Sequence, residues 1–213
     1  MTRLLLAALA AWILALTPAA PARAQAALPT APDKMIEVLS NQILDRIKAE
    51  PDLRTGDLRR LSQFADETVM PYVNFERMTA LAVGRAWRTA TPEQQKQLMT
   101  EFRALLLRTY AGALSAVRDQ TVRVKPLRAA PEDTEVIVRS EIVGTRGDPV
   151  QLDYRMEKSN PHWRIYDLNV LGVWLVETYR NQFAQEINAR GIDGLIKVLA
   201  DRNRQFAAQS GKS

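Results

Sequence analysis

Hydrophobic residues in the first part of the chain recur with the period of an α-helix. From Asp33 to Lys48 they follow one another at spacings of three and four residues, which places them on one helical face: Ile36, Leu39, Ile43 and Ile47. The same period predicts a shorter helix over residues 57–68. This helix should end at Met70-Pro71, because the residue before a proline avoids the helical region.

Two further helices are expected, each with a recognisable beginning. Asn74 is a favourable N-cap for a helix that ends at Gly84, a residue that tolerates the left-handed conformation at a helix end. Thr91-Pro92-Glu93-Gln94 is a capping box with proline at the first helical position. Apolar residues then follow one face to about Val117, which predicts the longest helix of this part of the chain.

The hydrophobic period then changes to two, which is typical of β-strands with one buried face. Alternating apolar and polar residues predict four strands, over residues 121–125, 136–143, 150–157 and 163–170. The links between them are short and rich in turn residues, which favours an antiparallel meander. After Gly172 the helical period returns, is interrupted at Gly191, and resumes in a last helix with apolar positions to Phe206.

Helices grouped before and after a meander indicate an α+β fold with a four-stranded antiparallel sheet covered on one face by helices. The other face should be solvated, because charged side chains occupy the alternate positions of the strands: Arg123, Arg139, Glu141, Asp153, Arg155 and Glu157. No internal repeat or linker divides this part of the chain. We expect a single domain over residues 34–206 and a polar tail over 207–213.

The first 24 residues have the features of a secretory signal peptide. A positive N-terminus with Arg3 precedes an uncharged apolar run from Leu4 to Leu16, and Ala22-Arg23-Ala24 offers a small-residue cleavage site. The run is shorter than the roughly 20 residues of a spanning helix, so a membrane anchor is the weaker interpretation. We therefore expect an exported, soluble protein with a flexible lead over residues 25–33.

Composition and charge exclude several classes of protein. The hydrophobic content of 46% and charged content of 25% are those of a globular chain. The sequence has no cysteine and one histidine, which excludes disulfide frameworks, thiol nucleophiles and His-rich metal sites. A net charge of +5 suits anionic partners, but the basic residues are too dispersed for a nucleic-acid-binding stripe.

Motifs of catalysis are absent, and few single residues are candidates. No phosphate-loop, dinucleotide, zinc-hydrolase or serine-hydrolase signature occurs. His162 lies in a turn with no oriented acid partner, so a solvated histidine is the favoured interpretation. Asp167 lies in an apolar strand, where a structural acid paired with an arginine such as Arg180 is favoured over a catalytic acid. For Arg85, an anion contact and an ion pair are about equally supported.

The aromatic residues fall on helix and strand faces that converge on the sheet. Beyond the signal peptide they include Trp87, Trp163 and Trp174, together with five tyrosines and five phenylalanines. From periodicity alone an ordinary filled core is favoured over a lined cavity. Composition does not separate these two possibilities.

Longer motifs resemble one known family over essentially the whole chain from Met35 to Leu199. They occur in the family's order and spacing at Tyr72–Met78, Gly84–Gln95, Phe102–Tyr110, Trp163–Leu168, Gly172–Val176, Tyr179–Phe183 and Gly191–Ile196. These segments closely resemble the MlaC family, also called the toluene-tolerance family, of periplasmic phospholipid carriers in the maintenance-of-lipid-asymmetry system. Asn74, where an acidic residue is more usual, and Trp174, where a small polar residue is common, depart from the pattern. The second departure could alter the pocket shape.

The resemblance implies a fold, a ligand and partners. The expected fold is a nuclear-transport-factor-2-like cone with added helices, holding the acyl tails of a glycerophospholipid in a deep cavity between sheet and helices, with the headgroup near solvent. The family's partners are an inner-membrane ABC transporter complex and an outer-membrane lipoprotein associated with porins. No catalysis and no cofactor are implied, and a carrier that docks at two membranes by the same mouth is most simply a monomer.

The predicted faces give a hypothesis for the residues that line the tail cavity. They come from the helices, the sheet and the following segment: Phe75, Met78, Leu81, Phe102, Leu106, Tyr110, Val138, Leu152, Tyr154, Tyr166, Val173, Val176 and Tyr179. Arg85 and Arg88 are candidates for headgroup or partner contact. Two alternatives stay open: an isomerase or dehydratase that uses Asp167 inside the cavity, and a chaperone or scaffold with a filled core and no ligand.

Overall fold

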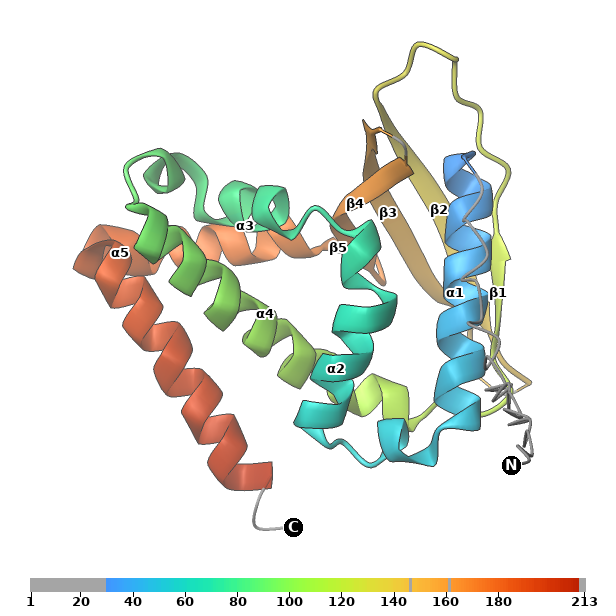
Figure 1. Ribbon diagram of the computed structural model, residues 1–213, viewed down its shortest axis with the longest axis horizontal. Helices are drawn as coiled ribbons and strands as arrows, with labels where there is room; N and C mark the ends of the chain where they lie inside the picture. The colour runs from blue at the N-terminus through green and yellow to red at the C-terminus, as the bar shows by residue number, and fades with distance from the viewer. Residues whose placement is uncertain (1–29, 146, 161, 211–213) are drawn as a thin grey trace, which may run out of the picture.

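The computed structural model describes residues 30–145, 147–160 and 162–210 (Figure 1). The signal peptide expected over residues 1–24 and the first part of the expected lead lie outside these residues. The helical first half comprises α1 (Pro32–Ala49), the 3-10 helix η1 (Pro51–Arg54), α2 (Leu58–Thr68), η2 (Met70–Tyr72), α3 (Phe75–Val83), η3 (Gly84–Arg88) and α4 (Pro92–Ser115). The strands and last helix are β1 (Thr121–Val124), β2 (Glu135–Val143), β3 (Val150–Ser159), β4 (His162–Val170), β5 (Val173–Trp174) and α5 (Leu175–Ser210).

The helix beginnings follow the local chemistry that the sequence predicts. The Thr91 hydroxyl accepts a hydrogen bond from the amide of Gln94 at 3.2 Å, and the Gln94 side chain accepts one from the amide of Thr91 at 3.0 Å. This confirms the capping box at the start of α4. The Asn74 side chain accepts from the amide of Arg77 at 3.0 Å, which caps α3.

The sheet has the strand order β1-β2-β3-β4-β5, with every neighbouring pair antiparallel. The α+β class and the four long strands are therefore confirmed. The short strand β5 was not anticipated, because two residues are too few to show an alternating pattern. The register of β3 and β4 shifts between Arg155 and Met156, so Tyr166 has no partner on β3 and forms a bulge.

Helices cover one face of the sheet and extend beyond it, as Figure 1 shows. α1 packs on this face, where its Met35, Ile36 and Leu39 join Val138 and Met156 in one hydrophobic cluster. A second cluster holds α3, α4 and α5 together around Phe102 and Phe183. A third joins α1, η1 and α2 to the end of α4. The core is thus divided into three clusters.

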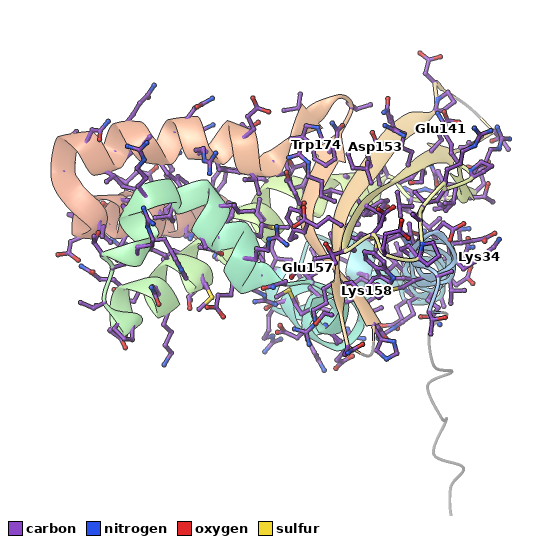
Figure 2. The ribbon with its side chains drawn as sticks, turned by 90° about the horizontal axis from the view of Figure 1, so that it is seen from above. Lys34, Glu141, Asp153, Glu157, Lys158 and Trp174 are labelled. Carbon is purple, nitrogen blue, oxygen red and sulfur yellow. The ribbon has the colours of Figure 1, made fainter. Side chains whose placement is uncertain are left out.

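The outer face of the sheet is solvated only in part, which corrects the sequence prediction. Asp153 is only 6% exposed, and the guanidinium of Arg155 lies 3.9 Å from the ring centre of Trp174 on β5. Figure 2 shows Trp174 and Asp153 near one another on the side of the sheet away from Lys34 of α1. The unpredicted strand β5 brings Trp174 onto this face and covers it. Trp174 therefore does not line the space between sheet and helices.

The last helix bends sharply at Gly191, where the backbone has φ 71° and ψ −174°. The sequence predicts this interruption. Beyond it, the second segment of α5 turns back and runs beside α4 (Figure 1). The helix continues to Ser210, so the first residues of the expected polar tail are helical. No helix in the described part of the chain combines the length and the hydrophobicity of a membrane-spanning segment.

Candidate functional site

An apolar cavity of about 360 Å³ lies between the sheet and the helices, where the three hydrophobic clusters meet. Its wall comes from α1, α2, the η2 segment, α3, α4, the sheet and the start of α5, including Ile36, Leu39, Ile43, Leu61, Phe64, Val69, Met70, Val73, Phe75, Met78, Leu106, Leu107, Tyr110, Ala111, Leu114, Leu152, Tyr154, Ile165, Leu168 and Leu175. Cavities of this kind, concave and mostly apolar, are the usual form of sites for small ligands.

Local periodicity explains why these residues share one wall. On α4, Leu107, Ala111 and Leu114 follow at helical spacing, and on β3 Leu152 and Tyr154 occupy alternate positions. Leu106 and Tyr110 of α4 are only partly buried, because α1 and the sheet do not close completely on this face. The cavity is therefore a space between packed elements and not a filled core.

The polar groups of the wall bond mainly to neighbouring protein groups, although the buried Nε of Arg103 has no hydrogen-bond partner. Arg103 donates to the Ser62 hydroxyl at 3.1 Å and to the Asp66 carboxylate at 2.7 Å, so its charge is held against α2. Burial raises the pKa of the Tyr154 hydroxyl above its ordinary value, and hydrogen bonds with Ser40 and Ser140 offset part of that rise. These groups leave an interior suited to hydrocarbon.

Six of the predicted tail-binding residues line this cavity, from α3, α4 and β3: Phe75, Met78, Leu106, Tyr110, Leu152 and Tyr154. Five others pack in the neighbouring clusters and are not in its wall: Leu81, Phe102, Val138, Val176 and Tyr179. Phe102, for example, meets Tyr179 edge-on with ring centres 4.9 Å apart. Helical spacing places such residues on an inward face without distinguishing the packed part of that face from the hollow part.

Two predicted tail-binding residues lie elsewhere. Tyr166 is the bulged residue of β4, and its hydroxyl donates to the Glu135 carboxylate at 3.0 Å while the Arg77 guanidinium lies 3.8 Å from its ring centre. The bulge shifts the strand alternation by one residue, so Tyr166 faces this charged group and not the cavity. Val173 is 54% exposed at the turn into β5.

The two arginines predicted to contact a headgroup or partner are remote from the cavity. Arg85 and Arg88 are both exposed on η3, the green turn between α3 and α4, at the end of the molecule away from the sheet (Figure 1). Neither contributes to the cavity wall. The distance between these arginines and the cavity depends on the direction in which α3 runs. The sequence motif that contains the arginines carries no information about that direction.

Asp167 is fully buried but lies outside the cavity, on the opposite face of the sheet. Its carboxylate accepts from Arg155 at 2.9 Å and from the backbone amides of Leu168 and Val176 at 2.9 Å and 3.0 Å. The pairing with Arg155 corrects the expectation of Arg180, which instead donates to the carbonyl oxygen of Leu81 at 3.0 Å. Burial raises the pKa of the Asp167 carboxyl despite these partners.

This placement removes the acid that an enzyme would require inside the cavity. Asp167 joins β4 to the first turn of α5, which is a structural role. Among the described residues, no three acidic or histidine side chains gather closely enough to bind a metal ion. The described residues of the wall are mostly apolar and can enclose an apolar group.

The α1 and α2 residues of the wall were missed by the sequence analysis. Ile36, Leu39 and Ile43 were recognised as one helical face, but were not assigned to the cavity. Leu61 and Phe64 of α2 were likewise not assigned. The only available signal was the helical period, which is the same for a residue against protein and a residue against a cavity.

The comparisons with known proteins agree with this geometry. Residues 37–201 match the family model described as MlaC protein. An intermembrane phospholipid transport system binding protein of Haemophilus influenzae is 25% identical over 173 residues, which cover 80% of this chain and 81% of that protein. A toluene tolerance protein of Pseudomonas putida is 22% identical over 163 residues, covering 76% and 75% of the two chains.

A solved structure provides the corresponding comparison of folds. The phospholipid-binding protein of Ralstonia solanacearum, in complex with a phospholipid, is 50% identical and superimposes with a TM-score of 0.77. The alignment covers 81% of this chain and 96% of that chain. Sequence and fold therefore lead to the same conclusion: this chain belongs to the MlaC protein family.

Proposed function

We propose that this protein is a phospholipid carrier that holds the acyl chains of a glycerophospholipid in the cavity between sheet and helices. The observation that carries the proposal is the apolar cavity itself, in a chain 50% identical to a protein that was solved with a phospholipid bound. The cavity also separates this function from a scaffold, which needs only a filled core. No carboxylate is among the described residues of its wall, which favours carriage over catalysis.

The energetics of hydrocarbon burial support this function. Each methylene removed from water contributes about 0.8 kcal/mol, so two acyl chains supply ample binding free energy. The difficult step for a carrier is then release. Contact with a partner at the membrane is the natural trigger for release.

The carrier moves phospholipid between the outer and the inner membrane as part of an intermembrane transport system. It acts in the periplasm, to which the signal peptide of residues 1–24 directs it. Its partners are an inner-membrane ABC transporter complex and an outer-membrane lipoprotein associated with porins. The protein works as a monomer, so that one mouth serves both partners.

Native mass spectrometry of the mature protein, purified without detergent, tests the proposal. Organic extraction then identifies the bound lipid, and acceptor vesicles report its transfer. We expect one phospholipid per chain that passes to the vesicles. A protein that is empty and also refuses added phospholipid would contradict the proposal and favour a scaffold.

A further inference from the structure

A second hollow lies beside the apolar cavity, between α4, the two segments of α5 and the end of β4. It has a volume of about 540 Å³, and we call it the Arg202 groove. Tyr110 of α4 and Leu175 of α5 line both the groove and the apolar cavity, so these two side chains form the partition between them. A ligand that passes this partition would occupy both spaces.

The chemistry of the groove differs from that of the cavity. Among the described residues that line it, Arg202 carries the only charge. Four neutral polar side chains share the lining: Gln182 and Gln205, whose amides can donate, and Thr109 and Thr178, whose hydroxyls donate to the backbone carbonyl oxygens of Leu105 and Trp174. A single positive charge with neutral donors and no carboxylate suits a monoanion.

The charge of Arg202 is available to a ligand. Within the described part of the chain Arg202 forms no ion pair, whereas the neighbouring Asp201 is bound by Lys197 at 2.9 Å and also by Arg204. Glu101, on the facing helix α4, accepts hydrogen bonds from Asn203. The nearby carboxylates are thus engaged with other side chains.

Arg202 lines the groove together with Tyr179 and with Tyr110 of the partition. Burial raises the pKa of Tyr179, while a hydrogen bond with Thr109 and the positive charge of Arg202 oppose that rise. Tyr179 in turn acts on Tyr110 of the partition, whose pKa is raised by burial and by this neighbour.

We infer that the groove binds the phosphate of the lipid whose acyl chains fill the cavity, with Arg202 as its anion contact. This inference rests on the proposed function. A glycerophospholipid carries one phosphodiester anion next to its acyl chains, which matches one free arginine next to an apolar cavity. The guanidinium fork can donate two parallel hydrogen bonds to phosphate oxygens. Arg202, and not Arg85 or Arg88 as the sequence analysis predicted, is then the residue that contacts the headgroup.

The test compares phosphatidylglycerol with diacylglycerol that has the same acyl chains, each loaded from vesicles into delipidated protein. Arg202→Gln should weaken phosphatidylglycerol binding by about fivefold, the size expected for an exposed charged contact, and leave diacylglycerol binding unchanged. Arg202→Lys should restore part of the loss, because it keeps the charge without the fork. Arg190→Gln is the matched control, since it removes the same charge from α5 outside the groove and leaves the partners of Asp201 in place, and it should change the binding of neither lipid.

Two results would overturn the inference while the protein remains folded by circular dichroism. If Arg202→Gln weakened the binding of both lipids equally, Arg202 would be a structural residue. If it weakened the binding of neither lipid, Arg202 would not contact the bound lipid. A wild-type protein that takes up neither lipid would instead overturn the proposed function on which the inference rests.

A final experiment tests whether the groove binds the phosphate of the lipid or a soluble phosphate compound. Glycerol 3-phosphate alone is added to the lipid-loaded protein while the Arg202 guanidinium signal is followed by NMR. We expect no shift, because the headgroup already occupies the groove. A saturable shift with the lipid still bound would show that the groove takes a soluble phosphate, and the headgroup assignment would be wrong.

Discussion

Arg155 and Asp167 face one another across β3 and β4, with the guanidinium nitrogen 2.9 Å from the carboxylate oxygen. The carboxylate is 1% exposed, whereas the arginine side chain is 34% exposed and rests on Trp174. The other carboxylate oxygen holds the amide of Val176 in the first turn of α5. This pair therefore fixes the direction in which the last helix leaves the sheet.

Removal of the arginine should destabilise the protein, because it leaves the Asp167 charge buried without its partner. We expect Arg155→Met to lower the free energy of unfolding by about 2 kcal/mol, less than for a fully buried pair because Arg155 is partly exposed. Arg139→Met on the exposed part of β2 is the control and should change it by less than about 0.5 kcal/mol. Urea denaturation measures both variants. Equal changes in the free energy of unfolding of the two variants would mean that the Arg155–Asp167 pair does not stabilise the protein.

The raised pKa of Asp167 gives a pH dependence with a defined sign. In the folded protein this carboxyl binds a proton more readily than in the unfolded chain. Its contribution to the free energy of unfolding is present below the ordinary value of 3.8 and is lost as pH rises through the raised pKa. Asp167→Asn should lack this decline. Stability curves of the two proteins across the acidic range check it, and a constant difference between them would contradict the assignment.

The bend of α5 depends on the positive φ of Gly191. No atom would meet a Cβ at this position, so Gly191→Ala tests the backbone conformation alone. We expect a loss of about 2 kcal/mol, because a φ of 71° with a ψ of −174° is strained for alanine. Gly112→Ala, within α4, should instead stabilise the protein by about 0.5 kcal/mol through helix propensity. Thermal unfolding of both variants should therefore shift in opposite directions.

The assignment of the tail cavity can be tested with a charge. Leu152→Glu places a carboxylate in the apolar wall, so we expect the bound phospholipid to fall at least about tenfold, as the cost of a buried charge predicts. Val150→Glu makes the same change at an exposed position of the same strand and should retain the lipid. Native mass spectrometry counts the lipid in each variant. Undiminished lipid in a folded Leu152→Glu protein would exclude that residue from the site.

The sequence predicted those parts of the fold that depend on local chemistry. The capping box at Thr91, the end of α3 at Gly84 and the interruption at Gly191 each follow from one or a few residues, and all three are present. The strand alternation also predicted the faces of β2 and of the first half of β3. These features need no knowledge of distant partners.

The parts that were missed depend on tertiary contacts. The bulge at Tyr166 reverses the face of one residue. Because β5 is too short to show a period, the sequence did not show that Trp174 lies on the outer face of the sheet or that Asp153, correctly placed on that face, is buried there. The same limitation applies to the site. Phe102 and Leu106 lie on one helix with the same hydrophobic spacing, yet only Leu106 borders the cavity, because α5 fills the space beside Phe102.

The division of the core into three clusters links cargo to folding. An unfilled apolar space costs stability, since the side chains around it lose contacts on one side. A ligand that occupies this space binds only the folded chain and raises its free energy of unfolding by mass action. The empty carrier is then the less stable form, and the melting temperature of the protein becomes a measure of how much of it is loaded.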